Sequence, residues 1–91
     1  MSPTRRVAFI TGGAQGIGEA IALGLAQDGL DVAILDVKDK EDLMKGVTKR
    51  VTELGRRALW FVGDVTNEDS VKSAIEETVE KLGGLDVVRT Q

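Results

Sequence analysis

Four short, mainly apolar runs alternate along the chain with longer segments whose apolar residues recur at helical spacing. The runs span residues 7–10, 31–35, 58–62 and 85–88. Continuously apolar runs of this length are typical of parallel strands that are buried on both faces. Strands alternating with helices predict right-handed crossover units and a parallel sheet.

The first helical segment is expected to begin near Gly16 and to stop at Gly29. Its apolar positions at helical spacing are Ile17, Ala20, Ile21, Gly24 and Leu25. Ala22, Leu23 and Ala26 broaden this face. Because glycine has no side chain, Gly24 is the position where this helix is expected to approach the sheet closely.

Two further helices are expected, one in the charged stretch 37–53 and one from Thr66 to Leu82, with Thr66 as the N-cap. The apolar stripe of the second helix is Leu43, Val47, Val51 and Leu54. The stripe of the third helix is Val71, Ala74, Ile75, Thr78, Val79 and Leu82. The charges of the second helix then form a solvated face. Trp60, in the third strand, is interpreted as a core residue, with a binding role as the alternative.

The first strand runs directly into residues 11–18, which read Thr-Gly-Gly-Ala-Gln-Gly-Ile-Gly. Glycines at such a point allow a tight turn, close approach of backbone to a pyrophosphate, and close packing of the next helix. The phosphates would lie at the N-terminus of that helix, where free N–H groups and the helix dipole attract an anion. A glycine-rich turn without a ligand is the alternative. A triphosphate-binding loop is a poor fit because Gly16 is not followed by Lys and Ser or Thr.

Asp36 ends the second strand, near the offset of about 20 residues at which a dinucleotide site places the acid that binds the ribose. A solvated acid at a strand end is the other interpretation of Asp36. As a ribose ligand, Asp36 favours NAD over NADP, because a 2′-phosphate would bring a second anion against its carboxylate. Lys38 and Lys40 are close enough to turn toward such a phosphate and weaken this preference.

The composition narrows the possible functions. A chain of 91 residues is one domain at most, and its net charge of −3 is dispersed, so nucleic acid is not expected as a partner. Without cysteine or histidine, neither a disulfide framework nor a zinc site is expected, and no metal ligand is assigned. No run approaches the length of a membrane span, so a soluble, cytoplasmic protein is expected.

With the glycine motif in place, the chain resembles the N-terminal part of a short-chain dehydrogenase/reductase, whose motif reads Thr-Gly-x-x-x-Gly-x-Gly. The acid after the second strand, the Asp64-Val65 pair after the third, and residues 85–88 extend the likeness over the chain. The resemblance implies a partial Rossmann-type, doubly wound parallel sheet of the α/β class. It would have about four strands in the order 3-2-1-4 and three helices, ending in the fourth strand.

The resemblance also implies the cofactor contacts. The residues concerned are Gly12, Gly16 and Gly18 at the pyrophosphate, Ile17 beside it, Asp36 at the adenosine ribose, and Asp64 with Val65 at the adenine. Asp64 could instead be a turn former, and Thr11 is interpreted as structural.

The chain departs from the family after the fourth strand. The family carries a catalytic Ser and a Tyr-x-x-x-Lys pair further on, whereas this chain contains no tyrosine. Residues 1–91 are therefore expected to be an incomplete dinucleotide-binding domain without the catalytic half. No catalytic residue is assigned, and the chain is expected to be inactive alone.

Two interpretations of the chain remain open. One is the cofactor-binding portion of an oxidoreductase that transfers hydride between nicotinamide and an alcohol or carbonyl, met here as a truncated product, a splice form or a mis-ended gene model. The other is a non-catalytic dinucleotide-binding or regulatory chain. It would self-associate or bind a full-length homologue through the exposed edge of its fourth strand.

Overall fold

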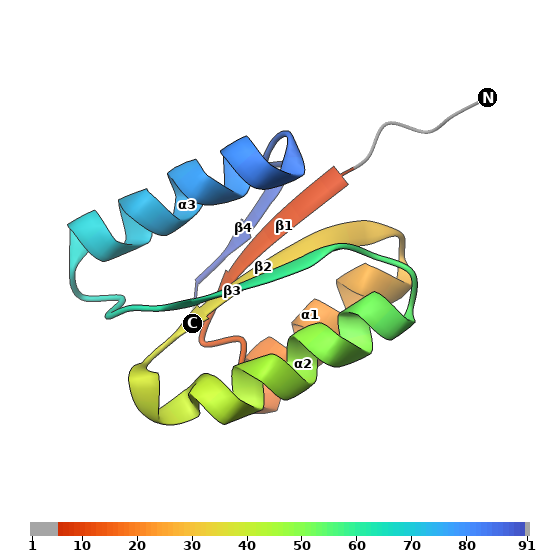
Figure 1. Ribbon diagram of the computed structural model, residues 1–91, viewed down its shortest axis with the longest axis horizontal. Coiled ribbons are helices and arrows are strands. Elements are labelled where there is room, and N and C mark those ends of the chain that lie inside the picture. The colour runs from red at the N-terminus through yellow and green to blue at the C-terminus, as the bar shows by residue number, and fades with distance from the viewer. Residues whose placement is uncertain (1–5, 91) are drawn as a thin grey trace.

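The computed structural model describes residues 6–90, which form a four-stranded parallel sheet with helices on both faces (Figure 1). The elements in order are β1 (Arg6–Thr11), α1 (Gly16–Gln27), β2 (Leu30–Asp36), the 3₁₀ turn η1 (Lys38–Lys40), α2 (Glu41–Glu53), β3 (Ala58–Val62), α3 (Glu68–Leu82) and β4 (Val87–Arg89). The strands lie in the order β3-β2-β1-β4. The predicted Rossmann-type order 3-2-1-4 is therefore confirmed.

The strands follow the predicted apolar runs, except at β4. This strand begins at Val87, which pairs with Ala8 of β1, rather than at Leu85. Asp86 just before it is joined to β1 in two ways. Its carboxylate Oδ2 accepts from the Val7 N–H at 2.9 Å, and its own N–H donates to the Val7 carbonyl, also at 2.9 Å. The Asp86 carboxylate thus accepts the Val7 N–H in place of a backbone carbonyl of the neighbouring strand.

The helices divide between the two faces of the sheet, with α1 and α2 on one face and α3 on the other (Figure 1). The core under α1 and α2 is formed by Ile10, Ala14, Ala22, Ala26, Val32, Ile34, Met44, Val47 and Val51. The core under α3 is formed by Val7, Phe9, Ala33, Leu35, Ala74 and Leu82. Alternate residues of β1 and β2 thus serve opposite cores, which explains why these strands are apolar throughout.

The buried stripe of α1 differs from the prediction. Gly18, Ala22 and Ala26 face the sheet, whereas Ile17 is 73% exposed. Gly24, expected to approach the sheet, has open space where a Cβ would lie. The close approach occurs instead at Gly18, in the first turn of the helix, and is made to the backbone of Gly12 and Gly13. Periodicity alone could not place the stripe because nearly every position of α1 is apolar or small.

The buried stripe of α2 begins at Met44, one position after Leu43, where the predicted stripe begins. Met44, Val47 and Val51 are buried, whereas Leu43 and Leu54 are 45% and 44% exposed. The η1 turn occupies residues 38–40, so the α-helix starts only at Glu41. Leu54 follows the last helical residue as the C-cap, and so lies at the end of the buried face.

The N-cap of α3 is Asn67, not Thr66. The Asn67 side chain accepts from the backbone N–H groups of Asp69 at 2.9 Å and Ser70 at 3.3 Å. The Thr66 hydroxyl instead donates to Asp64 Oδ1 at 2.7 Å. Thr66 and Asn67 both have side chains that can cap a helix. Because the Thr66 hydroxyl is hydrogen-bonded to the Asp64 carboxylate, Asn67 serves as the N-cap.

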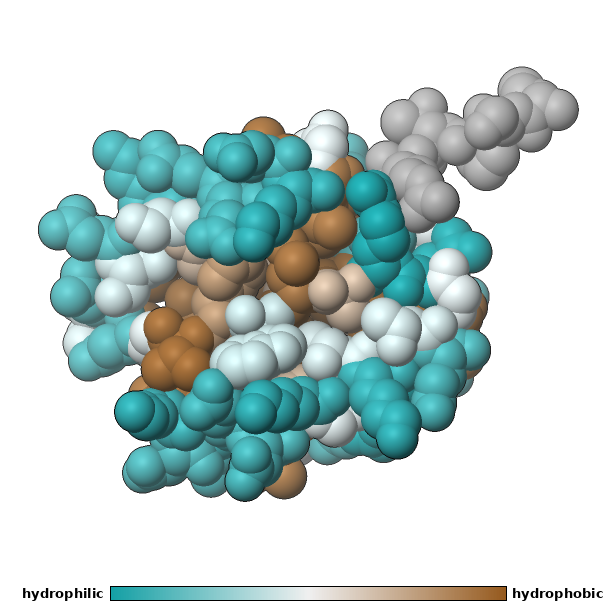
Figure 2. All heavy atoms as spheres, in the orientation of Figure 1, coloured by the Kyte–Doolittle hydropathy of each residue, from teal (hydrophilic) through white to brown (hydrophobic). Residues whose placement is uncertain are grey.

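The strand β3 forms one edge of the sheet, and its residues 58–61 are half-buried. Figure 2 shows apolar side chains at the surface between α3 and α2, along this edge. Trp60 packs against the core under α1 and α2, with Lys45 Nζ 5.5 Å from its ring centroid. Trp60 is thus a half-buried residue at the margin of this core, in partial agreement with the core interpretation.

Arg57, whose side chain is 44% exposed, links the start of β2 to the C-terminus of α3 through an ion pair with Asp31 and a hydrogen bond to Leu82. Asp31, 1% exposed, accepts from Arg57 Nε at 2.9 Å and from its backbone N–H at 2.8 Å. The same guanidinium donates to the Leu82 carbonyl at 2.9 Å, in the last turn of α3. This link holds the end of the sheet opposite the glycine-rich loop.

Candidate functional site

Three loops meet at the carboxyl ends of β1, β2 and β3. These strands are parallel neighbours, and the pairs Thr11↔Leu35 and Asp36↔Val62 place their ends side by side. Ligands of open α/β sheets bind outside the carboxyl ends of the strands. The glycine-rich loop, Asp36 and the Asp64-Val65 pair therefore lie along one edge, in the order in which the sequence predicts them.

The glycine-rich loop, residues 12–15, leaves β1 in a conformation that needs glycine. Gly12 has φ 68° and Gly16 has φ 62°, both in the left-handed region. The Gly12 N–H donates to the Leu35 carbonyl at 2.8 Å, which fixes the turn against β2. Apart from its chain neighbours and its own helix, no atom of residues 6–90 lies within 4 Å of the place that a Cβ on Gly16 would take, so the backbone there is open to a ligand.

Two other glycines of the motif are required for packing. A Cβ on Gly18 would lie 2.0 Å from the Gly12 carbonyl oxygen, so the helix can rest against the loop only at glycine. A Cβ on Gly13 would lie 2.6 Å from Ile34 Cγ2. Gly13 is not among the site residues predicted from the sequence. The signal was the Gly12-Gly13 doublet, since one glycine would have sufficed for the turn.

The N-terminus of α1 presents backbone donors at this edge. Gln15 is its N-cap, and the Gln15 side chain makes no capping hydrogen bond. The first N–H groups of an α-helix have no partner within the helix, and they carry the positive end of its dipole. Ile17, in the first turn, has its side chain largely in solvent. This helix end can hold an anion without a cationic side chain.

Asp36 is the last residue of β2, and its carboxylate contacts the glycine-rich loop. Its Oδ1 accepts from the Val37 N–H at 2.8 Å, and its Oδ2 accepts from the Ala14 N–H at 3.3 Å. The Asp36 carbonyl also accepts from the Gly63 N–H at 2.9 Å, which ties the third loop to the second. A carboxylate has about four acceptor positions, so lone pairs remain on Asp36 for a hydroxyl donor.

Asp64 and Val65 lie in the loop after β3. The Asp64 Oδ1 accepts from the Thr66 hydroxyl at 2.7 Å and from the Thr66 N–H at 2.8 Å. These two bonds, the hydroxyl first, hold the pKa of Asp64 below its ordinary value of 3.8. The turn-forming role of Asp64 is therefore present in the structure, and Val65 beside it is 47% exposed.

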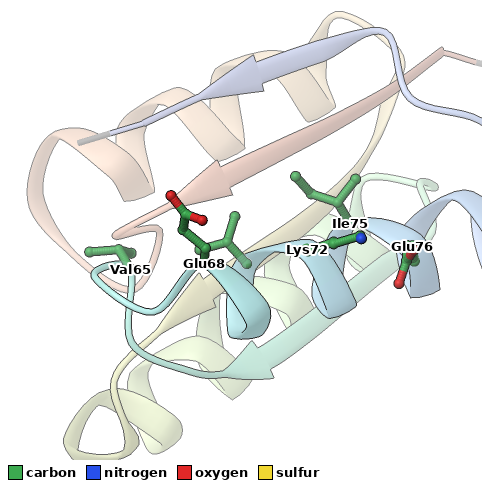
Figure 3. A pocket seen from close by; sticks show the side chains of 6 residues that line it. Val65, Glu68, Lys72, Ile75 and Glu76 are labelled. Carbon is green, nitrogen blue, oxygen red and sulfur yellow. The ribbon is translucent and has the colours of Figure 1, made fainter.

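An open pocket of about 420 Å³ lies along one side of α3 (Figure 3). Its lining consists of Val65, Glu68, Val71, Lys72, Ile75 and Glu76. Val65 is the one residue of the predicted cofactor site in this lining. The glycine-rich loop and Asp36 are not part of this lining.

Two further findings concern residues 6–90 only. Within this range, no helix is long and apolar enough to cross a membrane. Over the same residues, no three acidic side chains are grouped so that they could hold a metal ion.

The fold and the loop geometry define a Rossmann-type α/β protein with a glycine-rich turn at its first strand. The family model for short chain dehydrogenases matches residues 6–90. A short-chain dehydrogenase/reductase from Armillaria gallica is 45% identical over 83 residues, which cover 91% of this chain and 32% of that protein. The chain therefore belongs to the short-chain dehydrogenase/reductase family. It spans about a third of the length of the curated relatives it matches.

Solved structures of the family superimpose on the chain closely. A blue fluorescent protein from a metagenomic library, in complex with NADPH, has a TM-score of 0.88 and is 36% identical. Carveol dehydrogenase from Mycobacterium avium, in complex with NAD, has a TM-score of 0.85 and is 32% identical. Each match covers 91% of this chain and 34% of the other. Both nicotinamide cofactors thus occur among the structural neighbours.

Proposed function

We propose that the chain binds a nicotinamide dinucleotide at the carboxyl edge of β1, β2 and β3. The observation that carries this proposal is that free backbone donors and a carboxylate acceptor lie side by side along that edge. Backbone N–H groups at the start of α1 suit a pyrophosphate, and the Asp36 carboxylate beside them suits the hydroxyls of a ribose. Family membership and the NAD- and NADPH-bound neighbours support the same ligand class.

The proposed roles follow the order of the loops. Gly12, Gly16 and Gly18 line the pyrophosphate, and the exposed Ile17 side chain lies over it. The Asp36 carboxylate accepts from the hydroxyls of the adenosine ribose. The Asp64 carboxylate and the Val65 backbone contact the adenine, with the exposed Val65 side chain offering an apolar surface to the ring.

We further propose NAD rather than NADP. A ribose hydroxyl donating to the Asp36 carboxylate forms a charge-assisted bond worth roughly 1.5–3 kcal/mol. A 2′-phosphate would bring a dianion against the same carboxylate. Gln15 provides no positive charge in the loop, and the residue after Asp36 is Val37. Lys38 and Lys40, in the η1 turn, are the cations nearest in sequence that could offset the repulsion.

On this proposal, residues 1–91 are an incomplete dinucleotide-binding domain, the cofactor-binding portion of an oxidoreductase that transfers hydride between nicotinamide and an alcohol or carbonyl. The nicotinamide supplies the hydride chemistry, and these residues supply binding and orientation. The protein is proposed to be cytoplasmic.

A second candidate function is a non-catalytic chain that binds the dinucleotide and pairs with itself or with a full-length homologue. The observation favouring it is the exposed edge at β4. Val88 there is 49% exposed, and the side of α3 carries the open pocket. An unpaired strand edge is a template for strand addition. Co-purification of the native chain with a larger family member would separate this candidate from the first.

Titration of the ¹⁵N-labelled chain with NAD, followed by amide chemical shifts, tests the proposed site. We expect the largest shifts at Gly12, Gly16, Ile17 and Gly18, with smaller ones around Asp36 and Val65. Shifts confined to the pocket along α3, or no shifts at millimolar NAD, would contradict the proposal.

A further inference from the structure

The Asp36 carboxylate is hydrogen-bonded to the backbone of the glycine-rich loop. Its Oδ2 accepts from the Ala14 N–H at 3.3 Å, across 22 positions of the sequence, while its Oδ1 accepts from the Val37 N–H at 2.8 Å. Both oxygens therefore already hold a backbone donor. If Asp36 served only to bind the ribose of the cofactor, it would need neither of these two backbone hydrogen bonds.

The loop has other contacts with the end of β2, and all are made by consecutive residues. Gly13 lies against the Ile34 side chain so closely that a Cβ would come within 2.6 Å, and the Gly12 N–H donates to the Leu35 carbonyl at 2.8 Å. The Ala14 bond to Asp36 is the last of this series. It is also the one nearest Gly16, where the chain turns into α1 with open space above the backbone.

We infer that Asp36 is a positioning residue for the glycine-rich loop, which it holds in the anion-binding conformation before the cofactor arrives. Ala14 is 2% exposed, so an unpaired N–H there would be a buried donor without an acceptor. The carboxylate prevents this and fixes the loop just before the helix N-terminus. Preorganisation of this kind strengthens binding because less ordering remains to be done when the ligand binds. This inference rests on the proposed dinucleotide site.

A diphosphate ligand without ribose hydroxyls separates the two roles of Asp36. We choose 2′,3′-dideoxyadenosine 5′-diphosphate, which keeps the adenine and both phosphates but offers no hydroxyl to Asp36. If Asp36 acted only on the ribose, its neutralisation would leave the affinity for this probe unchanged, or raise it by removing a negative charge. If Asp36 positions the loop, the same change lowers the affinity.

Asp36→Asn is the sharpest variant because asparagine has nearly the same shape as aspartate. Its amide has one oxygen for two backbone donors, so one of them loses its partner, and the longer Ala14 bond is the one we expect to be lost. We expect Asp36→Asn to bind the probe about three- to tenfold more weakly than the parent chain. Asp39→Asn is the charge-matched control. Its carboxylate is exposed in η1, and we expect it to leave the affinity unchanged or slightly raised.

Amide hydrogen exchange in the free chain tests the inference without any ligand. In Asp36→Asn the Ala14 amide should exchange about tenfold faster, while the Gly12 amide, bonded to the Leu35 carbonyl, should keep its rate. Faster exchange at both amides would mean general loosening of the fold and would overturn the inference. Unchanged exchange at Ala14, or equal or tighter binding of the probe to Asp36→Asn, would also overturn it. Failure of the parent chain to bind the probe would count against the proposed function, and the exchange measurement would still decide the role of Asp36.

Discussion

Gly18 rests directly on the backbone of Gly12. A Cβ on Gly18 would lie 2.0 Å from the Gly12 carbonyl oxygen and 2.7 Å from its carbonyl carbon. Because both atoms belong to backbone, no rotamer change can relieve the contact. The third glycine of the motif therefore sets the distance between α1 and the loop.

Gly18→Ala should destabilise the fold by about 3 kcal/mol, at the upper end of the cost of overpacking. Gly24→Ala, in the same helix, is the matched control. Nothing lies within 4 Å of its Cβ position, so it should stabilise the chain by about 0.5–1 kcal/mol through helix propensity. Urea unfolding followed by circular dichroism measures both. Equal midpoints for the two variants would contradict the packing described for Gly18.

The sequence sufficed for the strands and for the place of the glycine-rich loop because both depend on strong local signals, whereas the strand order followed from the family resemblance. Apolar runs such as 7–10 are typical of strands buried on both faces. The Gly12, Gly16 and Gly18 spacing then marks the turn between the first strand and the first helix.

The sequence did not suffice for details that depend on competition between neighbours. The cap of α3 went to Asn67 because the Asp64 carboxylate had bound Thr66. The stripe of α1 was misplaced because its small residues pack on the sheet while Ile17 stays in solvent. The bond from Ala14 to Asp36 left no pattern in the sequence, because any residue except proline supplies that N–H.

Thr66→Val should raise the pKa of Asp64 toward its ordinary value of 3.8, because valine removes the hydroxyl donor. The Thr66 N–H bond remains, so the pKa should stay below that value. In the parent chain the lowered pKa contributes stability that is present above pH 4 and is lost as the pH falls through the folded-state pKa. Carbon NMR titration of the Asp64 carboxyl group measures the change. An unchanged pKa in the variant would contradict the cause assigned here.

The free chain should self-associate through the side of the sheet that carries β4. Val88 of β4 and Val79 of α3 are 49% and 44% exposed. A lysine on an edge strand opposes pairing with another strand. Val88→Lys should therefore lower the weight-average mass in sedimentation equilibrium. Leu54→Lys, at an equally accessible site at the end of α2, should not. A parent chain that is monomeric at high concentration would refute this expectation.

The 91-residue chain should not oxidise alcohols or reduce carbonyls with a nicotinamide cofactor. It contains no tyrosine or histidine to transfer the proton, and loss of that step alone costs a factor of about 10²–10⁴. Absorbance of the reduced nicotinamide, followed with a panel of alcohols and carbonyls, provides the test. A substrate-dependent signal that survives repeated purification would show that proton transfer has another source.

Isothermal titration of the chain with NAD and with NADP tests the central claim most directly. We predict that NAD binds more tightly, because its ribose hydroxyls donate to Asp36 where a 2′-phosphate would repel it. Asp36→Ala should remove most of the difference, which corresponds to roughly tenfold or more in affinity for a charge-assisted hydrogen bond. NADP binding to the parent chain as tightly as NAD would contradict the account, as would an Asp36→Ala variant that keeps the original ratio.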